Sequence, residues 1–364
     1  MNIVCDGLEL SDALLKVSKA ISNKVTNPIL EGIKLSAEDN ILTLSATDTE
    51  LSIEKKIKAD VKEEGETVVP GKFITEFVKK LANEKIELRV NENNKMTISY
   101  TDSESAIQCY NANEYPSFRK IQTTEFFGIS KKDFKTIVSK TIFAVALDDS
   151  RPILKGVLFD IDKNHMFALA LDGYRLAKVK KNVDSSIKKS IVIPSKSLSE
   201  ITKLIDDGDG IINIYIENSS IMVDLGDTKV ISRLIEGELM NYSNIIAANY
   251  ETLIVVNKTH LEEALERASL LSKVNNNFVK FDIKENVLQL TSNSEIGNIK
   301  ENVSITLKGK DLTIAFNARY FIESLRVNTN EFVKICFNKA TNPCVIVPIE
   351  EDEFLYLILP VRMI

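Results

Sequence analysis

Hydrophobic and polar positions along the chain follow two periods, one typical of strands and one typical of helices. Runs with alternating side chains, such as 41–46, have the period of two that turns one face of a strand toward a core. Segments with apolar residues three and four positions apart, such as 72–81, are typical of helices with one buried face. The pattern therefore predicts an α+β protein with a large share of sheet.

The predicted elements recur in the same order three times. Each repeat starts with a short strand, at Asn2–Cys5, Phe126–Ile129 and Leu253–Val256. A polar cap and an amphipathic helix follow, and the expected caps are Ser11, Ser130 and Asn257. Alternating strands, a second helix and more strands complete each unit, with the second helices expected within 72–81, 196–205 and 318–325.

Shared residues support this duplication. The block at 28–33 matches the block at 152–157 at an offset of 124, and Asp48 matches Asp172 at the same offset. Val68 to Lys72 matches Val192 to Lys196 in the same way, and a fainter third copy surrounds Arg319. We therefore predict three similar domains, each with two helices backed by antiparallel sheet, at 1–125, 126–249 and 250–364.

The composition is that of a protein with a well-formed core, because 44% of its residues are hydrophobic and 27% are charged. The four cysteines lack CxxC spacing, so we expect small buried side chains in a reducing compartment. The N-terminus has no signal-peptide pattern, and no apolar run is long enough to span a membrane. These features predict a cytoplasmic protein.

Positive charge is concentrated on the predicted helices. The chain carries a net charge of -6, yet five of the six helices have more Lys and Arg than Asp and Glu. For any single helix, lysines that merely solvate its exposed face are the simpler interpretation. Because the excess recurs at equivalent positions, it indicates a surface for phosphate groups. No recognition module or aromatic platform is present in these segments, so any contact with DNA should be with its backbone and largely independent of base sequence.

Motifs for catalysis and cofactors are absent from the sequence. The two histidines, His165 and His260, lie in unrelated contexts, which makes a metal cluster or a catalytic triad hard to build. Neither GxGxxG, GxxxxGK[ST] nor GxSxG occurs. The acidic pair Asp148-Asp149 is interpreted as a helix end or loop. We expect no enzymatic activity, no metal and no cofactor.

Seven blocks together resemble one known family over essentially the whole chain, the beta subunit of bacterial DNA polymerase III, or sliding clamp. They are TNPIL (26–30), TVVPGK (67–72), RPILKGVLF (151–159), LDGYRLA (171–177), IVIPSK (191–196), FNARY (316–320) and LYLILPVRM (355–363). The resemblance implies a DNA-clamp fold and a head-to-tail homodimer, with six domains forming a ring lined by twelve helices. Twelve helices about 10 Å apart enclose a hole about 28 Å wide, enough for duplex DNA. Duplication alone is equally compatible with three domains and no ring.

The resemblance also implies which residues contact DNA and which join the two subunits. The implied DNA-binding residues are Lys24, Lys72, Arg151 and Lys196. The implied dimer-interface residues are Ile107, Leu270 and Leu271, with Glu295 and Glu301 as the nearby acidic residues. Each cation also fits a role as an ordinary solvated surface charge.

A pocket for short peptide segments is the second implied site. Its residues come from the second repeat, the connector and the third repeat: Leu154, Leu171, Gly173, Tyr174, Arg175, Leu176, Met240, Asn244, Ile245, Asn317, Tyr320, Leu357, Ile358, Leu359, Pro360, Val361, Arg362 and Met363. The implied ligands are segments of the replicative polymerase, the clamp loader and repair proteins. Leu171, Tyr174 and Met240 replace the family's usual threonine, histidine and proline, which leaves the preferred motif open, and Ile364 extends the tail.

Two other classes of protein were weighed against a DNA-encircling scaffold. A peptide-binding adaptor that never encloses DNA would share the pocket, but it would not distinguish circular from linear DNA. A hydrolase would require a catalytic constellation that the sequence does not contain.

Overall fold

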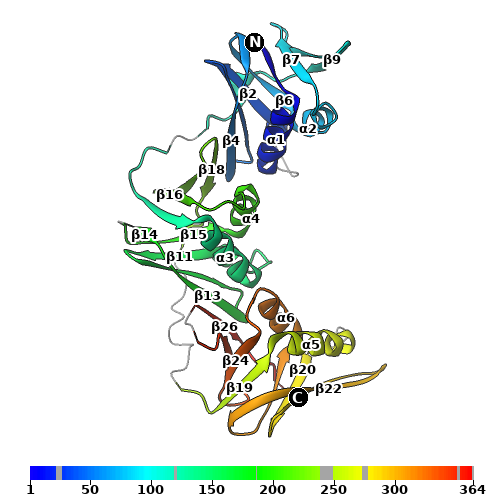
Figure 1. The fold of residues 1–364 in the computed structure, drawn as a ribbon, viewed down its shortest axis with the longest axis vertical. Coiled ribbons are helices and arrows are strands. Elements are labelled where there is room, and N and C mark those ends of the chain that lie inside the picture. Colours follow the sequence, from blue (N-terminus) through cyan, green and yellow to red (C-terminus); the bar gives the residue numbers. More distant parts are fainter. Residues whose placement is uncertain are drawn as a thin grey trace. The chain divides into compact units, whose positions relative to one another are not determined.

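The computed structural model describes residues 1–21, 27–118, 121–185, 187–237, 249–272, 278–350 and 353–362. They form two compact units, and each unit draws on two neighbouring sequence repeats (Figure 1). The first unit contains Met1–Lys131 and Lys196–Leu234. The second contains Lys132–Ser195 and Ile235–Ile364.

The first unit has two antiparallel sheets. The smaller sheet has the order β5-β1-β7-β8-β9, formed by Asp60–Glu63, Asn2–Asp6, Lys85–Val90, Lys95–Tyr100 and Ser103–Gln108. The larger has the order β10-β16-β17-β18-β4-β3-β2-β6, formed by Phe126–Ser130, Ile211–Glu217, Ser220–Asp224, Thr228–Arg233, Leu51–Lys58, Ile41–Thr47, Gly32–Glu38 and Gly65–Pro70.

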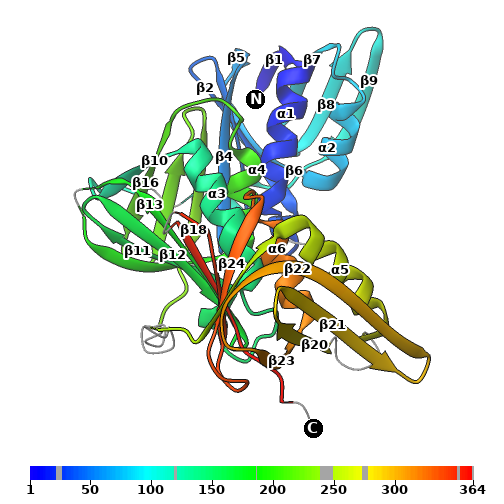
Figure 2. The ribbon, with the colours of Figure 1, turned by 60° about the horizontal axis from the view of Figure 1, so that its bottom comes forward.

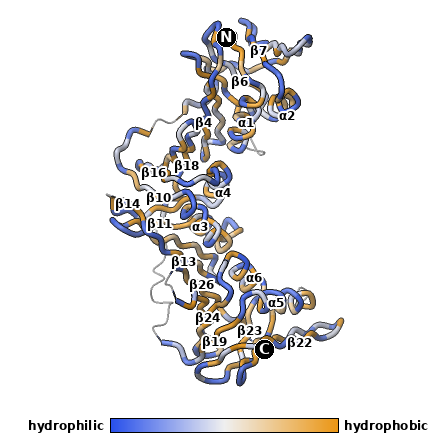
Figure 3. The backbone as a smooth tube through the Cα atoms, viewed as in Figure 1, coloured by the Kyte–Doolittle hydropathy of each residue, from blue (hydrophilic) through white to orange (hydrophobic). Residues whose placement is uncertain are grey.

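Helices α1 (Gly7–Val17), α2 (Gly71–Lys79) and α4 (Ser195–Leu204) belong mainly to this unit. The predicted start of the first helix at Ser11 is wrong. The cap lies five residues earlier, at Asp6, whose side chain accepts hydrogen bonds from the backbone N–H groups of Leu8 and Glu9. Ser11 is instead buried within the helix. In Figure 3, α1 and α2 carry both hydrophilic and hydrophobic positions, as expected of helices buried on one side.

The second unit is built on one 12-stranded antiparallel sheet. Its order is β15-β11-β12-β13-β26-β25-β24-β19-β22-β21-β20-β23, formed by Lys189–Pro194, Gly156–Asp162, His165–Leu171, Arg175–Asn182, Phe354–Ile358, Cys344–Val347, Phe332–Phe337, Thr252–Asn257, Gly297–Gly309, Val287–Ser294, Phe278–Lys284 and Leu312–Asn317. A short strand, β14 (Asp184–Ser185), also belongs to this unit.

Helices α3 (Lys131–Thr141), α5 (Lys258–Ser272) and α6 (Ala318–Arg326) belong mainly to the second unit. The predicted cap at Asn257 is confirmed, because its side chain accepts a hydrogen bond from the N–H group of His260. Figure 2 shows α5 and α6 side by side, close to strands β20–β22. The rings of Phe281, Phe316 and Phe321 meet beneath them with centroids 5.0 to 5.3 Å apart and form an aromatic core.

The large sheets of the two units share one plan. The order β10-β16-β17-β18-β4-β3-β2-β6 in the first corresponds strand by strand to β19-β24-β25-β26-β13-β12-β11-β15 in the second. The register also corresponds, since Ser52 pairs with Ile231 in one sheet and Leu176 pairs with Leu357 in the other. Six α-helices and antiparallel sheets among the described residues confirm the predicted fold class.

A buried ionic network anchors the start of β26. The side chain of Lys140 is 6% exposed, and its Nζ lies 3.1 Å from Glu353 Oε2 and 5.0 Å from the centre of the Phe354 ring. Lys181 Nζ lies 2.7 Å from Glu353 Oε1 and 3.1 Å from Asp133 Oδ1. Burial raises the pKa of the Glu353 carboxyl, but hydrogen bonds from Lys181 and Lys140 outweigh it, so the pKa lies below its usual value.

We expect Glu353→Gln to lower the free energy of unfolding by about 3 kcal/mol at pH 7, because it leaves the buried Lys140 ammonium without its counter-charge. A depressed carboxyl pKa stabilises the fold above the unfolded-state value and loses that effect as the pH falls through the folded-state value. The gap between the two proteins should therefore close below about pH 4. Urea unfolding between pH 3.5 and 8 measures this difference in the free energy of unfolding. A difference independent of pH would contradict the ionic role of Glu353.

Candidate functional site

A tight turn between β12 and β13 starts the first candidate site, in the second unit. Asp172 Oδ1 accepts hydrogen bonds from the N–H groups of Tyr174 (2.9 Å) and Arg175 (3.0 Å). Gly173 has φ +92°, in the left-handed region that glycine adopts without strain. The turn places Leu171 opposite Leu176 at the end of the two strands.

An apolar cluster forms beside this turn. The predicted residues Leu154, Leu171, Leu176 and Leu357 are all buried in it. Ala146, Leu169 and Val345 share the cluster, and Tyr250, Val347 and Leu359 pack against it while partly exposed. The sequence prediction missed Val345, Val347 and Tyr250. In the sequence, Val345 and Val347 look like any other alternating strand residues, so no local signal separates them from an ordinary core.

An aromatic pair borders the cluster. Tyr174 is 62% exposed, and its ring stacks on that of Tyr320 at a centroid distance of 6.3 Å. Tyr320 belongs to α6, which begins after Asn317, whose side chain accepts a hydrogen bond from the N–H group of Arg319. Burial raises the pKa of the Tyr320 hydroxyl. The two rings therefore offer an apolar surface with polar tips.

Arg175 supports this pair from within the unit. It is 6% exposed, and its guanidinium lies 4.6 Å from the centre of the Tyr320 ring and 5.4 Å from that of Phe143. It donates hydrogen bonds to Asp172 Oδ2 (3.0 Å), to the carbonyl of Phe143 (2.5 Å) and to Glu323. Arg175, which was predicted to line the groove, thus lies beneath the surface, and the sequence prediction missed its partners Phe143 and Glu323.

The predicted groove residues at the C-terminal end lie beside this cluster. Leu357 and Ile358 lie in β26, and beyond it Leu359 N–H donates to the carbonyl of Tyr174 (2.9 Å). Val361 N–H donates to the carbonyl of Ala315 (2.8 Å). Pro360 and Val361 are half-buried and Arg362 is exposed. Four predicted groove residues lie outside the described residues: Met240, Asn244, Ile245 and Met363.

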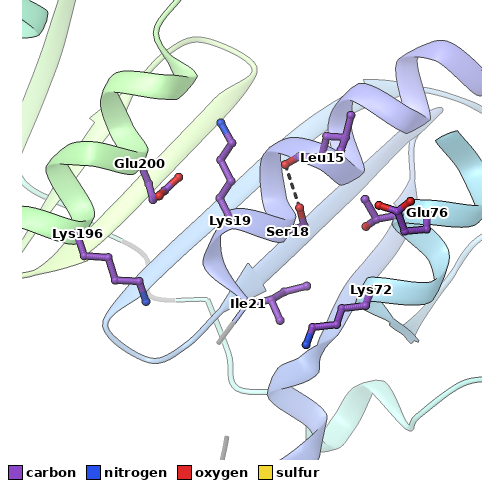
Figure 4. A pocket seen from close by; sticks show the side chains of 9 residues that line it. Leu15, Ser18, Lys19, Ile21, Lys72, Glu76, Lys196 and Glu200 are labelled. Carbon is purple, nitrogen blue, oxygen red and sulfur yellow. Dashed lines mark hydrogen bonds between the residues drawn. The ribbon is translucent and has the colours of Figure 1, made fainter. Parts of the chain in front are cut away.

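A second candidate site in the first unit is a pocket of about 640 Å³ lined by three lysines (Figure 4). Lys19 lies in the short helix η1 (Ser18–Ala20), and Lys72 and Lys196 are the second residues of α2 and α4. Lys196 Nζ lies 2.5 Å from Asp48 Oδ2, and burial lowers the pKa of the Lys19 ammonium. Leu15, Ile21, Glu76 and Glu200 are among the other lining residues.

The remaining predicted DNA-binding residues are not part of this pocket. Arg151 is exposed and lies in the second unit, immediately before the short helix η5 (Pro152–Lys155). Lys24 lies outside the described residues.

The predicted dimer residues lie on different units. Ile107 is half-buried on β9, the last strand of the smaller sheet in the first unit. Leu270 is 62% exposed on α5 of the second unit, and Leu271 beside it is half-buried. Of the nearby acidic residues, Glu301 is paired with Arg267 at 2.9 Å.

Reactive groups are scattered or sequestered in the part of the chain that the structure describes. There, no three His, Cys, Asp or Glu side chains come together as a metal site. All four cysteines are buried, and burial raises the pKa of the Cys5 thiol to about 12. Within the same ranges, no helix is both long and apolar enough to cross a membrane.

Comparison with known proteins assigns the class. Three family models match in order: the N-terminal, central and C-terminal domains of the DNA polymerase III beta subunit, at residues 1–119, 128–241 and 243–362. The beta sliding clamp of Staphylococcus epidermidis is 33% identical over 97% of this chain and 96% of its own length, and that of Staphylococcus aureus is 32% identical.

Solved structures show the same likeness. The DNA polymerase sliding clamp of Bacillus subtilis has a TM-score of 0.97 at 30% identity, and the beta subunit of Streptococcus pyogenes has 0.96 at 30%, each covering 100% of both chains. The fold and its triplicated helix pairs thus define a DNA clamp. The chain belongs to the DNA polymerase III beta subunit family, and its function is that of a DNA sliding clamp.

Proposed function

We propose that two copies of this chain join head to tail into a closed ring around duplex DNA. The observation that carries this proposal is a pair of open sheet edges, one on each unit. In the first unit, β9 pairs only with β8 among the described strands. In the second, the part of β22 from Gly297 to Ser304 pairs with β21 alone, since β19 takes only the part from Ile305 onward.

Open edges are usually covered or blunted, because their unpaired backbone groups invite another strand. Here each edge has apolar side chains nearby. Phe73 and Phe77 stack at 5.6 Å, and Phe77 meets Tyr100 of β8 edge-on at 5.9 Å, in the unit that carries β9. Ile296, at the start of the other edge, is 79% exposed, and Leu270 is also exposed in that unit. Contact between two unlike edges is head to tail, and it forms a ring where the rotation between copies closes, which we propose happens with two copies.

The lysine pocket supports sequence-independent contact with the DNA backbone. Its three ammonium groups stand among carboxylates, and Lys196 is already paired with Asp48, so any single phosphate contact is weak and screened by salt. Weak contacts let the protein slide along the DNA, while enclosure keeps it from dissociating. Lys72, Lys196, Arg151 and Lys24 are the proposed DNA-facing cations.

The groove of the second unit is proposed to take apolar peptide segments of the replicative polymerase, the clamp loader and repair proteins. The partly exposed side chains of Tyr250, Val347 and Leu359 pack against a leucine-rich cluster beside the exposed Tyr174, and such an apolar surface fits a hydrophobic segment. We propose that the protein acts without catalysis of its own and works in the cytoplasm.

Retention on DNA tests the ring. Clamps loaded on a nicked circle should stay bound for many minutes at 0.5 M NaCl and leave within seconds after the circle is cut, because a free end releases an enclosing ring. Lys72→Ala should leave retention on the circle unchanged. Gel filtration of the loaded complexes measures both, and equal loss from circular and linear DNA would contradict enclosure.

A further inference from the structure

The first unit contains a structural counterpart of the peptide groove. The turn between β3 and β4 has the same hydrogen bonds, because Asp48 Oδ1 accepts from the N–H groups of Glu50 (3.1 Å) and Leu51 (2.7 Å). Arg233 N–H donates to the carbonyl of Glu50 (2.8 Å), as Leu359 N–H does to Tyr174. The backbone that forms the groove therefore exists twice in the chain.

This second copy of the turn, with the strand paired beside it, is called the second frame, and its side chains are polar. Thr47, Thr49, Glu50 and Ser52 occupy the positions of Leu171, Gly173, Tyr174 and Leu176, and Arg233 that of Leu359. The hydroxyl groups of Thr47 and Ser52 already hydrogen-bond to each other (2.7 Å). An apolar peptide would bury the charged groups of Glu50 and Arg233 without partners, so this turn does not suit the ligand proposed for the groove.

The chain itself fills the apolar end of the frame. Tyr115 is 6% exposed and packs against Ile29 and Leu30, and Leu30 corresponds to Leu154 of the groove. Its hydroxyl accepts a hydrogen bond from the N–H group of Thr47 (3.1 Å) and donates to the carbonyl of Gly32 (3.2 Å). Only the polar end of the frame is open.

That open end is a pocket of about 260 Å³, lined by Thr49, Glu50, Ser52, Ser220, Ile231 and Arg233. Glu50 and Arg233 are exposed side chains of opposite charge, joined through their backbones. Within the described ranges neither side chain has an ion-pair partner. The pocket thus presents one free carboxylate and one free guanidinium beside hydroxyl groups.

Thr49 adds a separate indication. Its φ is +76°, a left-handed conformation that is unusual for a β-branched residue, and the equivalent position is Gly173. Strained residues are retained where the surrounding structure imposes them, and they concentrate at binding sites. A glycine would fit this turn without strain, yet the chain places a threonine side chain on the rim of the pocket.

We propose that this pocket, at the first repeat junction, is a second docking site, which receives a polar segment of a partner protein already held by the peptide groove. The segment presents a carboxylate to Arg233 and a cationic side chain to Glu50. The inference rests on the proposed function of the groove. It assigns the two frames different ligands, one apolar and one charged.

Three variants test the site: Glu50→Arg, Arg233→Glu and Thr49→Gly. The probes are the purified replicative polymerase and clamp loader of the same cell, and a short peptide with the polymerase's groove-binding segment. We expect each charge reversal to weaken binding of at least one full-length partner more than threefold and to leave peptide affinity unchanged. Thr49→Gly should also weaken binding of that partner. Its unfolding midpoint should equal or exceed that of the unmodified protein, because the glycine relieves backbone strain.

Glu38→Arg and Lys58→Glu are matched controls, since they reverse exposed charges of the same sheet outside the pocket. They should bind both partners normally. If all three pocket variants bind polymerase and loader like the unmodified protein while the peptide still binds, the docking site is refuted and the groove stands. If the unmodified protein does not bind the peptide, the proposed peptide groove is refuted, and so is the docking site that rests on it.

Discussion

Replacing both Leu270 and Leu271 with aspartate is expected to leave single chains in solution where the unmodified protein forms dimers. Leu270 is 62% exposed on α5, beside the open edge proposed to join the next copy. Two carboxylates at an apolar contact must lose water without gaining partners, at a cost of several kcal/mol. A loss of about 4 kcal/mol raises the dissociation constant about a thousandfold. Light scattering at micromolar concentration measures the mass.

Leu147→Asp is the control for this change, because Leu147 is 79% exposed and lies outside the elements proposed to meet. It should remain dimeric. Unfolding curves of the double variant should match those of the unmodified protein at equal monomer concentration below the dissociation constant. A double variant that stays dimeric would place the contact elsewhere on the surface.

Arg175→Ala is expected to weaken binding of the polymerase peptide more than tenfold and to lower the free energy of unfolding by about 3–5 kcal/mol. The change removes the partner of Asp172, of Glu323 and of the Phe143 carbonyl together. It also removes the cation beneath the Tyr320 ring, so the stacked pair with Tyr174 loses its support. Calorimetry with the peptide measures the affinity.

Glu323 explains why the loss should be large. Burial raises the pKa of its carboxyl, while hydrogen bonds from Arg319 and Arg175 lower it below the usual value. Without Arg175 this partly buried carboxylate keeps only Arg319, at 2.6 Å. Arg362→Ala, which truncates an exposed arginine of the same groove, should cost little stability. Unchanged peptide affinity in Arg175→Ala would refute the groove assignment.

Local sequence signals predicted the repeated elements well. Strand and helix periods, together with matching blocks such as 28–33 and 152–157, were enough to predict three copies of one repeat. The one helix start that was wrong depended on a competition between two possible caps, and Asp6 prevails over Ser11 because apolar residues on the helix face begin before Ser11. A polar residue near an amphipathic run does not by itself fix the first turn.

Contacts between distant strands were not accessible from the sequence. Nothing near Leu51 indicates that its strand pairs with Thr228–Arg233, or that Arg175 finds Glu323 on α6. For the groove, family resemblance supplied the residues that periodicity could not separate from core. It did not reveal that Arg175 points inward, because burial depends on neighbours from three elements.

The shared sheet plan also bears on how a closed assembly opens. At both junctions within the chain, β4 joins β18 and β13 joins β26 through continuous backbone ladders with buried side chains around them. Separating such a ladder breaks many hydrogen bonds at once, whereas the contact proposed between copies rests on two strand edges and a few apolar side chains. In the proposed ring, a clamp loader should therefore open the contact between subunits and leave the sheet within each chain intact.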